Sequence, residues 1–261
     1  MPSYLNIAIK DATVSKNMQF SKAKGLFITG TDTGIGKTLI TGGIARILCK
    51  QGLKVGVFKP VATGCRRQMG ELVSRDAKFL AMCAEADYPL SVITPVCYET
   101  PAAPIVCARV ENRPIDYEQI AAMYNYLCQT CDVVLAEGIG GVMVPLDEQT
   151  TILDLAAKMA LPTIIVARPK LGTINHTLLT LQAVRNAGLY SAGVVINGYS
   201  VPAADVAEET APGIIAQLGN TKILALVGYD DQSSVENLRL GQMALAGLGE
   251  CDWKSLALSN G

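Results

Sequence analysis

The chain has 261 residues, of which 50% are hydrophobic, enough for one sizeable core in a single α/β domain. Its formal net charge is −1 and its lysines and arginines are scattered, which disfavours a nucleic-acid-binding surface, and no apolar stretch approaches the ~20 residues that cross a bilayer. Eight dispersed cysteines are typical of reduced thiols, so the sequence indicates a cytoplasmic protein. The near-neutral, scattered charge indicates that its ligands are small molecules.

Residues 1–23 are expected to form an N-terminal arm ahead of one domain over 24–261. Apolar residues alternate with smaller or polar ones over residues 5–9, which hints at a short strand. Residues 11–24 are mostly polar and show no periodic pattern. We therefore expect the arm to be loose and flexible.

From residue 25 onward, short apolar runs alternate with longer segments of helical periodicity. This alternation predicts a mostly parallel sheet with helices on both faces, as in a P-loop NTPase-type α/β domain. Ligands of such sheets bind beyond the carboxyl ends of the strands, so the residues after each run are candidates for the site. The six predicted strands are 26–28, 55–58, 133–136, 163–167, 192–196 and 223–227.

The first predicted strand leads into residues 30–38, Gly-Thr-Asp-Thr-Gly-Ile-Gly-Lys-Thr, which we call the phosphate loop. A glycine-rich turn between a strand and an amphipathic helix can surround polyphosphate with backbone N–H groups at the positive end of the helix dipole. Lys37 would reach the outer phosphates and Thr38 would ligate magnesium. The strict pattern has glycine where this chain has Thr31, but its Gly-Lys-Thr end is intact. The residues expected to bind nucleotide here are Gly34, Ile35, Gly36, Lys37 and Thr38.

Two charged residues near the second predicted strand have two interpretations each. Lys59 ends that strand and precedes a proline, and its ammonium either points at the same phosphates or is solvated; spacing alone does not decide. Asp76 opens a helical run, where it either caps the helix or reaches a metal ion. The sequence favours the cap.

Glu137 ends the third predicted strand and is followed closely by Gly138, Gly140 and Gly141. In a chain with a phosphate loop, a carboxylate at this position is where a magnesium-associated acid would lie. The glycines would let the backbone come close to a ligand and donate N–H groups to it. A structural turn with a solvated carboxylate is the alternative.

The fourth and fifth predicted strands end in polar segments. After the fourth, Gly172 and Thr173 open a helix; Thr173 is expected to cap it, and the free N–H groups form a second anion site that suits a carboxylate. His176 is interpreted as an ordinary polar residue. After the fifth, the Asn197 amide could pair with a purine edge, with a turn as an equal alternative.

Cys128 and Cys131 form a lone Cys-x-x-Cys. A zinc site needs about four ligands, and His176 is the only histidine in the chain. We therefore interpret the two cysteines as helix-borne thiols packed near the core, not as metal or redox groups.

In chain order, five motifs closely resemble dethiobiotin synthetases over about residues 25–245. They are the phosphate loop, Lys-Pro-Val-Ala-Thr-Gly, Glu-Gly-Ile-Gly-Gly-Val-Met-Val-Pro-Leu, Lys-Leu-Gly-Thr-Ile-Asn-His and Val-Ile-Asn-Gly. The resemblance implies an ATP- and Mg²⁺-dependent cyclo-ligase of biotin synthesis, which closes a cyclic urea on 7,8-diaminopelargonic acid with CO2. A carbamate forms on one amine, the γ-phosphate converts it to a mixed anhydride, and the second amine displaces phosphate. The products are dethiobiotin, ADP and phosphate.

The resemblance also implies roles for individual residues. Lys37 and Lys59 would contact the phosphates and the carbamate, Thr33 and Thr63 would border the reacting groups, and Asn197 would face adenine. Enzymes of this family are homodimers that bind the substrate carboxylate across the subunit interface, so the resemblance implies a homodimer here too. The residues implied at magnesium are Thr38, Asp76 and Glu137. Those implied along the diamine and its carboxylate are Gly138, Gly140, Gly141, Gly172, Thr173 and Asn175.

Three features depart from the family pattern. Gly34 stands where the family usually has glutamate, which puts the nucleotide preference in doubt, and residues 226–231 are unusual for the segment near the base. The arm has no family counterpart. Two other functions stay open: an ATP-dependent ligase on a related diamine or diacid, and a nucleotide switch of the partitioning or division-site type. Such switches carry a lysine where this chain has Asp32.

Overall fold

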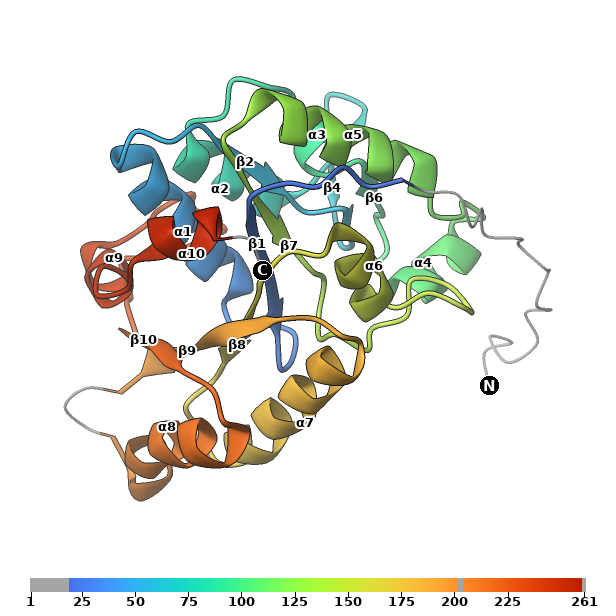
Figure 1. The fold of residues 1–261 in the computed structure, drawn as a ribbon. Coiled ribbons are helices and arrows are strands. Elements are labelled where there is room, and N and C mark those ends of the chain that lie inside the picture. Colours follow the sequence, from blue (N-terminus) through green and yellow to red (C-terminus); the bar gives the residue numbers. More distant parts are fainter. Residues whose placement is uncertain (1–18, 201–203, 260–261) are drawn as a thin grey trace.

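A six-stranded parallel sheet forms the centre of the protein in the computed structural model, which describes residues 19–200 and 204–259 (Figure 1). The predicted mostly parallel sheet is confirmed, and all six predicted strands are present. Their spatial order is β10-β9-β8-β1-β7-β2. They span Gly25–Gly30 (β1), Val55–Phe58 (β2), Val133–Glu137 (β7), Thr163–Ala167 (β8), Ser191–Tyr199 (β9) and Ile223–Gly228 (β10).

Helices cover both faces of this sheet, as predicted (Figure 1). One face packs against α1 (Lys37–Lys50), α2 (Arg75–Ala84), α9 (Gln242–Leu248) and α10 (Trp253–Leu258). The other packs against α5 (Tyr117–Thr130), α6 (Ile152–Met159), α7 (Thr173–Asn186) and α8 (Val206–Gly219). No helix within the described residues has the length and apolar character needed to span a bilayer.

Side chains alternate between the two faces along β1. Leu26 and Ile28 lie in the core formed with α1, whereas Phe27 lies in the core formed with α5 and α6. All three are fully buried. A strand covered on both faces reads as a continuous apolar run, which is why the runs predicted these strands so well.

A smaller excursion follows β2, the edge strand of the sheet. It contains two short strand pairs, parallel β3–β6 and antiparallel β4–β5. Its elements are β3 (Val61–Ala62), β4 (Arg66–Gln68), β5 (Glu71–Val73), α3 (Leu90–Ile93), β6 (Val96–Cys97) and α4 (Pro104–Val110).

The end of the predicted arm packs on α5. Phe20 stacks edge-to-face on Tyr124 with ring centroids 5.4 Å apart, and the Ser21 N–H donates to Asn125 Oδ1 at 2.7 Å. Residues 19–23 are therefore attached to the domain, which corrects the expectation of looseness for this part. The strand expected over residues 5–9 lies outside the described residues.

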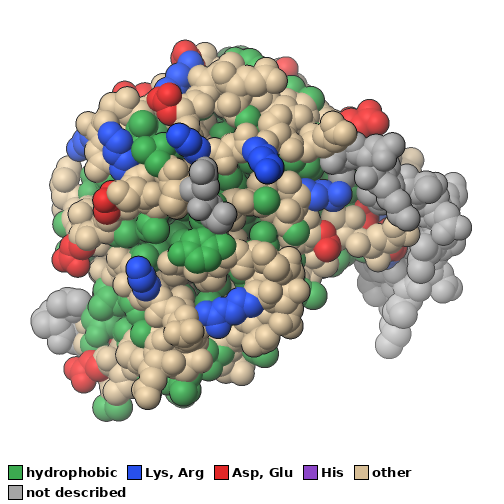
Figure 2. Space-filling view, viewed as in Figure 1, with side chains coloured by type: hydrophobic (Ala, Val, Ile, Leu, Met, Phe, Trp, Pro, Cys, Tyr) green, Lys and Arg blue, Asp and Glu red, His purple; other side chains and the backbone are tan. Residues whose placement is uncertain are grey.

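The strand order reverses at β1, because β7 and β2 lie on one side of it and β8, β9 and β10 on the other. Parallel sheets bind ligands at such a switch point, beyond the carboxyl ends of the strands. The fold thus brings the ends of β1, β7 and β8 together. Charged side chains on the face seen in Figure 2 are scattered, not gathered into a stripe.

Gly25→Ala is expected to destabilise the protein more than Gly52→Ala. Both glycines have positive φ, 148° and 83°, but a Cβ on Gly25 would lie 1.9 Å from the Val134 carbonyl oxygen, whereas Gly52 has open space. Strain alone should cost Gly52→Ala about 1 kcal/mol. The clash should add about 1–3 kcal/mol to the loss in Gly25→Ala. Denaturant unfolding measures both; equal losses would contradict this account of β1–β7 pairing.

Candidate active site

The phosphate loop joins the carboxyl end of β1 to the start of α1. Gly36 is the N-cap of α1, with φ 90° and no capping side chain, so the first N–H groups of the helix are available to a ligand. A Cβ on Gly36 would lie 2.0 Å from Asn197 Nδ2, which makes glycine necessary there.

Lys37 is 6% exposed and donates from Nζ to the Asp32 carbonyl oxygen at 2.7 Å. Burial lowers the pKa of Lys37 to about 8, although the nearby Glu137 carboxylate opposes this shift. An ammonium has three donors, so two remain for phosphate oxygens beside the bond to Asp32.

A salt bridge missed by the sequence analysis ties the phosphate loop to the end of β8. The Arg168 guanidinium pairs with the Asp32 carboxylate, whose other oxygen accepts the Thr33 N–H at 2.7 Å. This pair fixes the residue whose carbonyl receives Lys37. Its only sequence signal is that Arg168 follows a predicted strand directly, at the edge where ligands bind.

A buried ion cluster lies beside the loop, at the ends of β2 and β7. Lys59 Nζ is 2.7 Å from Glu137 Oε1 and 2.5 Å from Asp76 Oδ2, and the Thr38 hydroxyl donates to Glu137 Oε1 at 2.7 Å. Glu137 is 0% and Lys59 5% exposed, so neither the solvated-lysine nor the solvated-turn alternative holds.

Electrostatics keeps Lys59 and Asp76 charged. Burial alone would lower the pKa of Lys59, but the Glu137 and Asp76 carboxylates outweigh it and hold that pKa above its usual value. Burial also acts to raise the pKa of Asp76, yet the Lys59 charge keeps it below the ordinary range. The expected cap role of Asp76 is wrong, because the N-cap of α2 is Ser74, whose Oγ accepts the Ala77 N–H at 3.2 Å.

The oxygen atoms of this cluster suit Mg²⁺. Glu137 Oε2 is buried without a hydrogen-bond partner, and the Thr38 hydroxyl and the Asp76 carboxylate lie around the same lysine and glutamate. Within the described residues, no three His, Cys, Asp or Glu side chains are grouped as a metal site. Nucleotide-bound Mg²⁺ needs only one or two carboxylates, however, since phosphates and waters complete its shell.

The glycines after Glu137 pack against the phosphate loop. Gly140 has φ 62°, and a Cβ there would lie 3.3 Å from Thr33 Oγ1; one on Gly141 would lie 3.4 Å from the Gly30 carbonyl oxygen. The structure thus brings Thr33 and this glycine segment together. Thr63, after β3, is half-buried.

The start of α7 differs from its prediction. Gly172, with φ 93°, is the N-cap without a side-chain bond, and Thr173 is the first helical residue, 3% exposed with its hydroxyl unpaired. The expected Thr173 cap is therefore wrong. Asn175 and His176 are exposed on the first turn.

Asn197 lies within β9, so its turn alternative is wrong. Its Nδ2 donates to the Ile35 carbonyl oxygen at 2.9 Å, a contact that supports the phosphate loop from a distant strand. All eight cysteines are unpaired thiols; Cys128 lies in α5 and Cys131 at its end, packed against the core.

Comparison with known proteins places these features in a family. Residues 24–237 match the family model described as an AAA domain. The ATP-dependent dethiobiotin synthetase BioD of Thermodesulfovibrio yellowstonii is 43% identical over 213 residues, covering 78% of this chain and 88% of the relative. That of Bacillus subtilis strain 168 is 36% identical over 203 residues, covering 78% and 86%.

Solved structures share the fold at low sequence identity. The MinD cell division protein of Aquifex aeolicus is 14% identical with a TM-score of 0.57, covering 92% of this chain and 99% of that one. A ParA family ATPase from Chlorobium tepidum is 14% identical with a TM-score of 0.51, covering 90% and 98%. These likenesses confirm the P-loop NTPase-type fold, while the sequence relatives decide the family: the chain belongs to the ATP-dependent dethiobiotin synthetases.

Proposed function

We propose that this protein closes a cyclic urea on 7,8-diaminopelargonic acid with CO2, ATP and Mg²⁺, giving dethiobiotin, ADP and phosphate. The observation that carries the proposal is the buried cluster of Lys59, Glu137, Asp76 and Thr38 beside the phosphate loop. It offers two carboxylates, a hydroxyl and a fixed ammonium at the switch point of the sheet, which suits phosphoryl transfer.

The nucleotide would lie along the phosphate loop. Backbone N–H groups of Gly34, Ile35 and Gly36 would bind the phosphates at the positive end of α1, and Lys37 would donate to their outer oxygens. Asn197 would face adenine with its carbonyl oxygen, because its Nδ2 already donates to the loop.

Thr38, Asp76 and Glu137 would hold Mg²⁺. The ion supplies positive charge that neutralises the phosphate oxygens as the terminal phosphoryl group moves. Lys59 binds the Glu137 carboxylate through Oε1, which leaves Oε2 without a hydrogen-bond partner. The buried Glu137 and the half-buried Asp76 would thus both offer oxygen ligands.

Lys59 and Lys37 would also stabilise the carbamate and the mixed anhydride formed from it, with Thr33 at the reacting groups. Formation of the anhydride breaks the γ-phosphoryl bond to ADP and joins phosphorus to a carbamate oxygen. Attack by the second amine on the carbamate carbon then releases phosphate and closes the ring. The chain mainly positions charges and neutralises them, and it moves few protons.

The diamine would lie along Thr63, Gly138, Gly140 and Gly141. Its distant carboxylate would be bound at the start of α7 of a second subunit, by Gly172, Thr173 and Asn175, so we propose a homodimer with the substrate at its interface. Exposure of Asn175 on a helix N-terminus supports this assignment, since such a turn favours anions.

Formation of the cyclic urea is the direct test. The protein is incubated with diaminopelargonate, bicarbonate, Mg²⁺ and each common nucleotide in turn, and the product is sought by mass spectrometry. We expect dethiobiotin with ATP. The comparison among nucleotides shows whether Gly34, which has open space around it and φ 72°, broadens the range of nucleotides that the protein accepts. No product with any nucleotide would contradict the proposal, and product from another diamine only would support the related-ligase alternative.

In the same assay, Lys59→Ala should abolish diamine-dependent ADP release, a loss of at least about 100-fold in kcat. The variant should still bind nucleotide. Removing one partner of a buried pair also costs about 3–5 kcal/mol of folding free energy, so folding is checked by thermal unfolding in parallel. Lys54→Ala, at an exposed lysine before β2, is the control that should keep full turnover. Normal turnover in Lys59→Ala would remove Lys59 from the mechanism.

Asn175→Ala should raise KM for diaminopelargonate by more than it lowers kcat, because the carboxylate is remote from the reacting atoms. Steady-state kinetics with varied diamine separates the two constants. Gln182→Ala changes an exposed residue further along α7 and should leave both constants alone. An unchanged KM in Asn175→Ala would exclude this placement of the carboxylate.

ATP affinity should fall as pH rises through about 8, because Lys37 loses its proton there and a neutral amine no longer attracts phosphate. ATP is a polyanion and binds the protonated lysine more tightly than the neutral one, so its affinity is highest at pH values below this pKa. Calorimetric dissociation constants on both sides of pH 8 measure the effect. Lys37→Arg, which stays charged, should flatten the profile; an equally steep profile in that variant would assign the titration elsewhere.

A further inference from the structure

Two cysteines meet beside the substrate segment in the excursion after β2. Cys97 ends β6 and is paired in register with Ala62 of β3. The Cys65 N–H donates to the Tyr98 carbonyl oxygen at 2.9 Å, which continues the same pairing past Gly64. The backbone therefore holds the two cysteines in adjacent segments.

The two thiols affect each other's ionisation. The hydrogen bond between them raises the pKa of Cys65 and lowers that of Cys97. Cys97 sulfur also interacts with the backbone N–H of Ser74, the N-cap of α2. A helix N-terminus with an N–H donor favours thiolate, so Cys97 is the more nucleophilic of the two.

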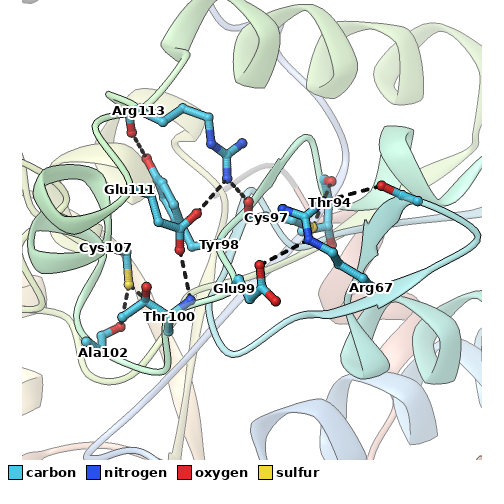
Figure 3. Close-up of polar contacts among 11 residues, drawn as sticks. Arg67, Thr94, Cys97, Tyr98, Glu99, Thr100, Ala102, Cys107, Glu111 and Arg113 are labelled. Carbon is cyan, nitrogen blue, oxygen red and sulfur yellow. Dashed lines mark hydrogen bonds and ion pairs between the residues drawn. The ribbon is translucent and has the colours of Figure 1, made fainter.

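Cys97 is the more accessible of the two thiols to a reagent from solvent. Cys65 is 5% exposed and Cys97 half-buried. An open cavity of about 770 Å³ lies beside the segment that follows Cys97, and Glu99, Thr100 and Arg113 are among its lining residues. Arg113, in this lining, donates to the Cys97 carbonyl oxygen (Figure 3).

Both cysteines are joined to parts of the proposed active site. Cys65 follows Thr63 by two residues, across Gly64 at φ 68°. Ser74, which contacts Cys97, caps the helix that carries Asp76. A covalent bond between the two sulfurs would fix the diamine segment to the start of the helix that carries a proposed magnesium ligand.

We propose that Cys65 and Cys97 form a reversible disulfide when a hydroperoxide oxidises the protein, and that this bond is a redox switch on substrate binding. Cys97 thiolate attacks one peroxide oxygen; the S–O bond forms, the O–O bond breaks, and the released hydroxide takes a proton and leaves as water. Cys65 sulfur then attacks Cys97 sulfur, forming S–S and breaking S–O. The Cys65 proton leaves with the hydroxide as a second water. The two sulfurs lose two electrons and the peroxide gains them.

The test treats the full-length protein with hydrogen peroxide and maps its peptides by mass spectrometry. We expect a linked Cys65–Cys97 peptide, lighter by two hydrogen atoms than its parts and separated again by dithiothreitol. Cys65→Ser and Cys97→Ser, each checked for folding, should lose the link. The double variant Cys128→Ser/Cys131→Ser should keep it. Free, alkylatable Cys65 and Cys97 in treated protein would overturn the proposal, as would a link between other cysteines.

The kinetic consequence rests on the proposed function. Oxidised protein should show a KM for diaminopelargonate raised by about tenfold, because small displacements at a substrate segment are costly. Cys65→Ser should show no such change after the same treatment. A linked peptide with an unchanged KM would support the disulfide but exclude its role as a switch on substrate binding. A linked peptide in a protein without cyclo-ligase activity would contradict the proposed function and the switch, but not the disulfide.

Discussion

The site depends on one buried ammonium. Glu137 is fully buried, and a buried carboxylate is stable as an ion only beside a positive charge. Lys59 provides that charge from the neighbouring strand and also binds Asp76 at the start of α2. Thr38, at the start of α1, adds a hydroxyl to the same carboxylate. One charge thus holds four elements in register around the space next to the phosphate loop.

The fold could be predicted from the sequence because the signals that define its strands and its phosphate loop lie in short, continuous segments. Strands buried on both faces are short apolar runs, and the glycine-rich loop needs only nine consecutive residues. Apart from the Thr173 cap, which is a local error of one position, the contacts that the sequence analysis missed join residues distant in the chain. Arg168 meets Asp32 across 136 positions and Asn197 meets Ile35 across 162. Periodicity carries no record of such contacts, and Asp76 was misassigned because its partner, Lys59, lies on another element.

The same fold also serves proteins of a different kind. MinD and the ParA family ATPase share the fold at 14% identity, a likeness that concerns architecture alone. What separates this chain lies in side chains at the strand ends. In this chain the Asp32 carboxylate of the phosphate loop is paired with Arg168, and Lys59 joins Asp76 to Glu137. Site chemistry, not topology, therefore distinguishes the functions.

The contact between Asn197 and the phosphate loop has a consequence for evolution. The Asn197 amide occupies the space that any side chain at position 36 would need, and it also donates to the loop. A side chain at position 36 would displace the Asn197 amide and so remove the donor of the Ile35 carbonyl, and φ 90° would strain it as well. Descendants of this sequence are therefore held to glycine at position 36 by steric exclusion and backbone conformation, even if their preference for a nucleobase changes.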